Sequence, residues 1–129
     1  MILINIDPAL SHPPVVRAEN DDEIAQTPPQ AIIVLSFDEK KMTSYRALID
    51  DGIPLALEVQ SLRHFLYAAN LGARWAICSK TLAPTLQKAA DTYLFETKVI
   101  AMITSVDEIE PLATVGIDGV WLVNNDSGN

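Results

Sequence analysis

Cys78, Ser79, Lys80 and Thr81 stand at the end of an apolar run and directly before a segment with helical periodicity. Two hydroxyls and an amine at such a junction can bind a phosphate, together with the amides of the helix that follows. The same residues can simply cap the helix while Lys80 stays in solvent. We expect Ser79, Lys80 and Thr81 to contribute to a site for a small anionic ligand, and both interpretations stay open.

Thr104 and Ser105 form a second junction of this kind, after the apolar run 98–104. Glu108 follows Ser105 at the spacing of a capping box, in which the serine accepts from a helix amide and the acid reaches back. Capping is therefore the simpler role for this pair, and ligand binding is the alternative.

Glu58 ends the apolar run 54–59, where a carboxylate can act as a general base. It can equally be an acid at a helix N-terminus or the partner of Arg63. Cys78 can be a nucleophile only if a cation lowers its pKa, and neither His12 nor His64 lies near it in sequence. We expect a buried, structural cysteine. The spacing of the two histidines and the cysteine fits no zinc site, so we expect no metal.

The elements that must position these residues follow from the apolar runs. Most runs are continuously apolar rather than alternating, which is typical of parallel strands covered on both faces. They lie at 2–6, 15–16, 31–37, 54–59, 74–79, 98–104 and 119–123.

Helical periodicity fills the stretches between the runs, so the chain is predicted to consist of repeated βα units. Polar residues expected to cap the helices are Asn20, Ser36, Ser61 and Ser105. Gly52, Gly72 and Gly116 precede strands and are expected to end helices in the left-handed conformation.

A single α/β domain is predicted over residues 1–129. Five of the eight prolines lie within residues 7–30, so the segment 1–30 is expected to be irregular, with one short helix near 21–26. The tail 124–129 is expected to be frayed.

Several segments resemble α/β-barrel families. "ALIDDGIPLALEV", "LGARWAICSKTLAPTLQKAAD" and "TKVIAMITSVDEIEPL" resemble βα units of the 2-keto-3-deoxy-6-phosphogluconate aldolases. "PPVVRAENDDEIAQTPPQAIIVLSF" is similar to the glycerol-3-phosphate responsive antiterminators. Both families are barrels that bind phosphorylated small molecules, and the resemblance spans roughly residues 13–123.

The sequence differs from the aldolases at positions that carry their catalytic residues. The position of their Schiff-base lysine falls on Trp121, which cannot form an imine. Glu58 matches their glutamate base, and Arg63 matches their arginine one residue out of register. The resemblance therefore implies the fold more than the activity. We expect a mainly parallel sheet, with a small or partial (β/α) barrel favoured over an open flavodoxin-like sheet.

Composition and missing motifs exclude several other classes of protein. Seventeen acids against nine scattered bases give a net charge of −8, which disfavours nucleic acid and anionic membranes. The chain has no Walker loop and no G-x-G-x-x-G, and it lacks the strand-end aspartate and lysine of a phosphoacceptor receiver domain. The single cysteine and the absence of a basic leader or a long apolar run favour the cytoplasm.

The sequence thus predicts a non-catalytic regulatory or structural module that binds a small anionic, phosphorylated ligand, without a cofactor. The ligand-binding residues would be Ser79, Lys80, Thr81, Thr104, Ser105 and Arg63. The alternative is a minimal barrel lyase or isomerase, acting on a phosphorylated or 2-keto acid substrate with Glu58 as base. A partial barrel leaves open sheet edges, so we expect a homo-oligomer.

Overall fold

The computed structural model describes residues 1–123, without the side chain of Asp21. This part of the chain forms seven strands, and each strand from β2 to β6 is followed by a helix. The strands are β1 (Ile2–Ile4), β2 (Val15–Arg17), β3 (Ile32–Ser36), β4 (Leu55–Glu58), β5 (Trp75–Ser79), β6 (Lys98–Ile103) and β7 (Gly119–Leu122). The α-helices are α1 (Asp21–Ala25), α2 (Met42–Asp50), α3 (Leu62–Leu71), α4 (Ala83–Tyr93) and α5 (Ile109–Thr114). Short 3₁₀ turns, η1 (Glu39–Lys41) and η2 (Val106–Glu108), lead into α2 and α5.

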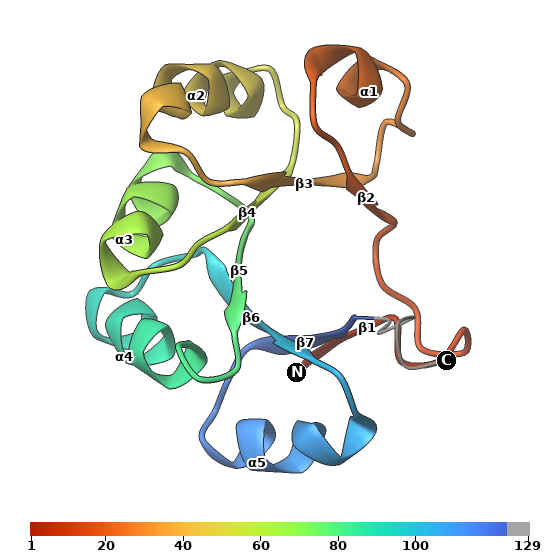
Figure 1. The fold of residues 1–129 in the computed structure, drawn as a ribbon, viewed down its shortest axis with the longest axis vertical. Coiled ribbons are helices and arrows are strands. Elements are labelled where there is room, and N and C mark those ends of the chain that lie inside the picture. Colours follow the sequence, from red (N-terminus) through yellow and green to blue (C-terminus); the bar gives the residue numbers. More distant parts are fainter. Residues whose placement is uncertain (124–129) are drawn as a thin grey trace.

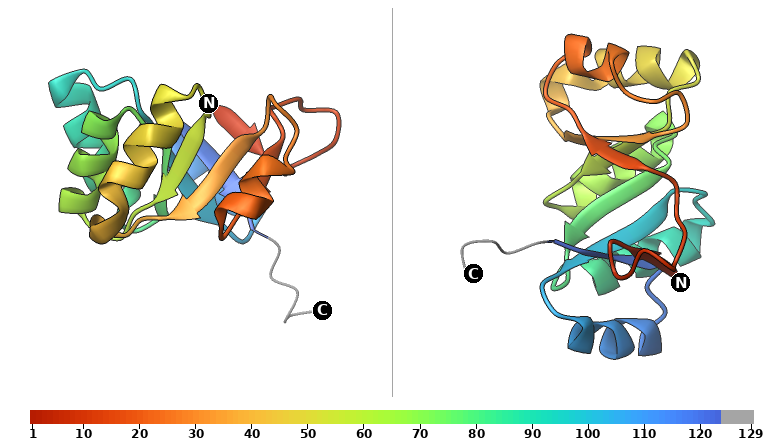
Figure 2. Two further views of the ribbon diagram at one scale, coloured as in Figure 1. Left: turned by 90° about the horizontal axis from the view of Figure 1, so that it is seen from above. Right: turned by 90° about the vertical axis from the view of Figure 1, so that its right-hand side faces the viewer.

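The strands form one sheet in the order β1-β7-β6-β5-β4-β3-β2, and every neighbouring pair is parallel. The sheet curls into a half-barrel with the helices on its convex side (Figure 1). Figure 2 shows the same arrangement from two further sides. The expected fold, an α/β chain of βα units in a partial barrel, is confirmed.

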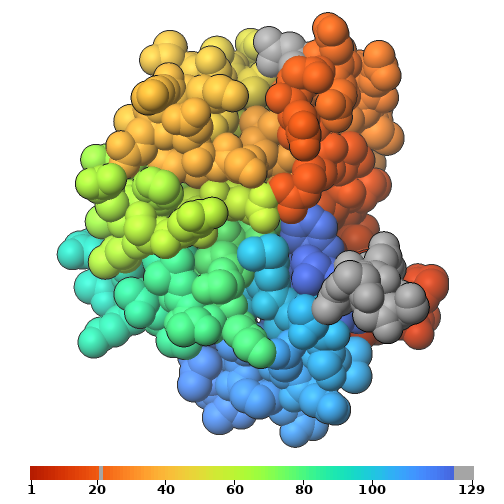
Figure 3. Space-filling view, viewed as in Figure 1, coloured from red at the N-terminus to blue at the C-terminus, as the bar shows by residue number. Residues whose placement is uncertain are grey.

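Both faces of the sheet are buried, which explains why the strands read as continuous apolar runs. Side chains alternate between the faces, so Ile33 packs under the helices while its neighbours Ile32 and Val34 point to the concave side. The concave side holds its own cluster, in which Ile77 and Ile100 are fully buried. The space on the concave side, which looks empty in the ribbon, is therefore filled by side chains (Figure 3).

The half-barrel is open between β1 and β2, which are consecutive in the chain but lie at opposite ends of the sheet. Residues 5–14 connect them without a helix or strand (Figure 1). Asn5 anchors the start of this connection, because its side-chain amide donates to the carbonyl of Leu122 at 2.8 Å. The connection therefore spans the gap between the two edge strands, β1 and β2, whose pairing would close a barrel.

Helix boundaries follow the expected signals in most places. Asn20, Ser61 and Ser105 accept the backbone hydrogen bonds of N-caps. Gly52, Gly72 and Gly116 all have positive φ. The cap expected at Ser36 is wrong, since Asp38 caps η1 by accepting from the Lys40 amide at 2.9 Å. β3 extends to Ser36, and this keeps Ser36 in the sheet, opposite Glu58.

In the part of the chain that is described, no helix combines the length and the apolar character needed to cross a membrane.

Candidate functional site at the carboxyl ends of the strands

The carboxyl ends of parallel strands share one rim, where α/β proteins place their ligands. In this half-barrel, the last concave-facing residues of the strands meet there. The register pairs Ser36 with Glu58, and it aligns Ser79, Met102 and Trp121 across β5, β6 and β7. We call this end of the concave side the mouth.

Arg17, Glu58 and Ser36 form a polar cluster at the mouth. Arg17 ends β2 and donates from Nη1 to Oε1 of Glu58 at the end of β4. Ser36, on the strand between them, donates to the same oxygen at 3.4 Å. Oε2 of Glu58 accepts no hydrogen bond from the residues described. One carboxylate oxygen is thus held by the protein and the other is available to a ligand.

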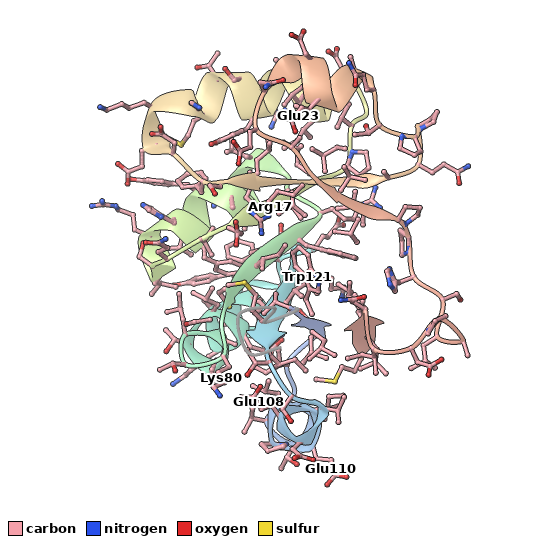
Figure 4. All side chains as sticks on the ribbon, turned by 45° about the vertical axis from the view of Figure 1, so that its right-hand side comes forward. Arg17, Glu23, Lys80, Glu108, Glu110 and Trp121 are labelled. Atoms are coloured by element: carbon pink, nitrogen blue, oxygen red, sulfur yellow. The ribbon has the colours of Figure 1, made fainter. Side chains whose placement is uncertain are left out.

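The guanidinium of Arg17 also lies over the indole ring of Trp121, 5.8 Å from its centroid (Figure 4). Its hydrogen bond to Glu58 is the main reason why the pKa of Arg17 is raised, against the lowering effect of burial. The Arg17 side chain is nevertheless 44% exposed, so the cation remains accessible from solvent.

A cavity of about 600 Å³ opens at the mouth beside this cluster. Its polar lining comes from three successive strand–helix junctions and its apolar lining from the walls below. The polar side chains are Ser36, Glu58, Gln60, His64, Ser79 and Thr81, and the apolar ones include Phe37, Ile77 and Met102. Hydroxyl, amide and carboxylate groups around apolar walls form the kind of pocket that binds a small polar molecule.

His64 in this lining has an unsatisfied nitrogen. Its Nδ1 is buried and has no hydrogen-bond partner in the described structure. The ring packs against Phe37, with 4.9 Å between the ring centroids, and Nε2 is 3.7 Å from Oε1 of Glu39. Unpartnered buried polar atoms are rare in native proteins, and a ligand or water in the cavity is one way to satisfy this one.

The structure places the residues predicted at the first junction, Ser79, Lys80 and Thr81, in two different environments. Ser79 and Thr81 line the mouth cavity, and Ser79 Oγ accepts from the Leu82 amide at 3.2 Å. Lys80 points away to the next junction, where it forms an ion pair with Glu108 (Figure 4).

Thr104 and Ser105 meet the same carboxylate as Lys80. Their backbone amides donate to Oε2 of Glu108 at 2.8 and 3.2 Å, and Ser105 completes the expected capping box. The hydrogen bond from Lys80, followed by that from the Thr104 amide, lowers the pKa of Glu108 to about 2. An anionic ligand at these three residues would have to replace Glu108.

Arg63 pairs with Glu39, with 2.8 Å between Nε and Oε1. The possibility that Arg63 is the partner of Glu58 is therefore wrong. The reason is that Arg63 lies in the first turn of α3, where it reaches Glu39 of η1, while Glu58 faces the concave side.

Cys78 is fully buried in the layer between the sheet and the helices, on the face opposite the mouth. Burial raises the pKa of its thiol to about 12. It is therefore a structural residue, as expected, and its thiolate is not accessible at neutral pH.

Arg17 and His64 were not predicted from the sequence as residues of the site. Arg17 carried a signal similar to that of Glu58, since it is a charged residue at the end of an apolar run. His64 gave no such signal, because its position in the first turn of α3 looks like that of any boundary residue.

No three His, Cys, Asp or Glu residues of the described structure gather in a group that could hold a metal ion. A scan against protein-family models finds no match to this chain, and a search of curated proteins finds no matching relative. The resemblance to the two barrel families therefore stays a prediction.

Proposed function

We propose that the chain is a non-catalytic binding module whose small anionic ligand lies in the mouth of the half-barrel. The observation that carries the proposal is the 600 Å³ cavity, which gathers polar side chains from three junctions next to an accessible arginine. A regulatory or structural role follows from binding without turnover.

The lining favours a ligand with a short hydroxylated carbon skeleton. Ser79, Thr81 and Gln60 offer donors and acceptors to hydroxyl groups, and Ile77 and Met102 pack against carbon atoms. Arg17 supplies a positive charge. A guanidinium has five N–H donors, and among the residues described Arg17 donates only from Nη1, to Glu58. Its other N–H groups can bind the ligand. Phosphorylated three- to six-carbon metabolites fit this description.

Binding is favoured over catalysis by the state of the reactive groups. Oε1 of Glu58 is engaged by both Arg17 and Ser36. Cys78 is buried on the opposite face, so it cannot serve as a nucleophile for a ligand in the mouth.

A lyase or isomerase is the second candidate, favoured by the unoccupied Oε2 of Glu58. A general base must reach the proton that it abstracts, and Glu58 lines the cavity where the substrate would lie. In that case a 2-keto acid would turn over, and Glu58→Gln would abolish the turnover while preserving the fold.

A thermal-shift measurement with ribose 5-phosphate tests the binding proposal. A ligand at 100 times its Kd stabilises the native state by about 2.7 kcal/mol. Thr81→Leu places apolar atoms in the cavity and should abolish the shift. Lys80→Ala is the matched neighbour outside the cavity and should retain it. A shift lost in Lys80→Ala but kept in Thr81→Leu would move the ligand to Lys80, Thr104 and Ser105, and turnover of a 2-keto acid would replace the binding role.

Self-association and a cytoplasmic location belong to the same proposal. β1 and β2 each pair on one side only, and such edges are templates for another strand. Sedimentation velocity at micromolar concentration tests the homo-oligomer, and a monomer would contradict it.

A further inference from the structure

A second hollow, of about 510 Å³, lies between α1 and α2 on the convex side of the same rim. It is lined by residues from β2, β3 and both helices, among them Arg17, Ser36, Lys41 and Ser44. Ser36 lines both this hollow and the mouth cavity, so the two spaces lie on either side of the end of β3. The Arg17–Glu58 pair links them, since Arg17 lines the hollow and Glu58 lines the cavity.

The polar groups of this hollow fall into two sets. Tyr45 Oη is occupied, because it donates to the Ser36 carbonyl and accepts from the Asp38 amide, both at 2.9 Å. Asn20 is occupied by Glu23, at 2.9 Å to its amide and 3.2 Å to its carboxylate. These groups hold the walls in place and are not free to bind a ligand.

The remaining polar groups are mostly donors. Lys41 Nζ and Ser44 Oγ have no hydrogen-bond partner among the residues described, and Arg17 uses only Nη1. The lining holds two cations, Arg17 and Lys41, and one acid, Glu19, and Arg17 is also paired with Glu58. The unpartnered donors of Lys41 and Ser44, together with the N–H groups of Arg17 that do not bond to Glu58, favour an anion such as phosphate.

We propose that Arg17, Lys41 and Ser44 form the subsite for the phosphate group of the ligand, whose carbon skeleton extends past Ser36 into the mouth. The proposal rests on the proposed function, because it assigns the charged part of the same ligand. It differs from the sequence prediction, which placed the anion at Ser79, Lys80, Thr81, Thr104, Ser105 and Arg63.

Inorganic phosphate is the direct probe, titrated at constant ionic strength and followed by backbone amide chemical shifts. Lys41→Ala should weaken binding at least fivefold. Lys40→Ala is the matched control, since Lys40 is the adjacent exposed lysine and does not line the hollow. Equal weakening in both variants, or no saturable shift near Lys41 and Ser44, would overturn the subsite.

Ribose and ribose 5-phosphate separate this inference from the proposed function. If both are right, ribose 5-phosphate binds more tightly than phosphate or ribose, and both Lys41→Ala and Thr81→Leu weaken it. If ribose 5-phosphate binds in a Thr81-dependent way but is unaffected by Lys41→Ala, the subsite is overturned and the mouth stands. If it binds no better than phosphate, with dependence on Lys41 alone, the subsite stands and the mouth proposal fails.

Discussion

Arg17 and Glu58 form an ion pair across the end of β3, although 41 residues separate them in the chain. Ser36 lies between them on β3 and donates to the same carboxylate oxygen. The pair joins the edge strand β2 to the interior strand β4 at the rim where the ligand is proposed. It therefore orients the two charged groups of the mouth relative to each other.

The strength of this pair can be measured with a double-mutant cycle of Arg17→Met and Glu58→Gln. Partly exposed ion pairs contribute little, so we expect a coupling free energy of about 0.5–1 kcal/mol in chemical unfolding. Strictly additive effects of the two substitutions would contradict this coupling.

Glu108 should make stability depend on acid pH. Its carboxyl pKa falls from an ordinary value of 4.5 to about 2 in the fold. A depressed pKa means that the unfolded state binds the proton first. The contribution is therefore complete above about pH 4.5 and is lost as the pH falls towards 2. Urea unfolding between pH 2 and 6 should show this loss.

Glu108→Gln should remove that part of the pH dependence. Glu110→Gln is the control, since Glu110 lies near Glu108 on α5 but forms no ion pair in the structure described (Figure 4). An unchanged pH profile in Glu108→Gln would contradict the contact with Lys80 and the two amides.

Cys78 should be unreactive towards a thiol reagent in the native protein at pH 8. It is fully buried, and its pKa of about 12 leaves almost no thiolate at that pH. The thiol should become reactive when denaturant unfolds the chain. Rapid modification of the native state would mean that the layer between sheet and helices opens locally.

Gly119 should be essential for the pairing of β1 with β7. A Cβ there would lie 2.8 Å from the Cβ of Ile2 and 2.9 Å from its carbonyl oxygen. Gly119→Ala should destabilise the fold by about 1–3 kcal/mol, as overpacking does, and it should speed hydrogen exchange at Ile2 and Ile4, whose amides face β7.

Gly52→Ala is the control that separates the steric clash at Gly119 from the backbone strain of replacing a glycine. Gly52 has a φ of 86°, and nothing lies within 4 Å of an added Cβ. The substitution should cost about 1–2 kcal/mol through left-handed strain while exchange at Ile2 and Ile4 stays slow. Equal protection of β1 in both variants would show that the close approach at Gly119 is relieved elsewhere.

The sequence predicts the strands well because both faces of the sheet are buried. Runs such as 31–37 and 98–104 leave no polar face, and the structure places β3 and β6 within them. The position of β1 could not be predicted, since apolar composition says nothing about its pairing partner. Strand ends also carry an error of one or two residues, and this is why Ser36 was taken for a helix cap.

The site was harder to predict than the fold, because its contacts join distant parts of the chain. Ser79 and Thr81 were recognised at a junction that does line the mouth. Lys80 was grouped with them, but its long side chain reaches Glu108, 28 residues further on. Local spacing explains the capping role of Glu108 and cannot reveal this second partner.

The most direct test of the account is to map the binding of ribose 5-phosphate by backbone amide chemical shifts. The account predicts saturable shifts at the mouth, centred on Ser36, Gln60 and Ser79, which Thr81→Leu removes. Shifts confined to the opposite end of the half-barrel, around Leu10 and Ser11, or no saturable shift with any phosphorylated three- to six-carbon metabolite, would contradict it.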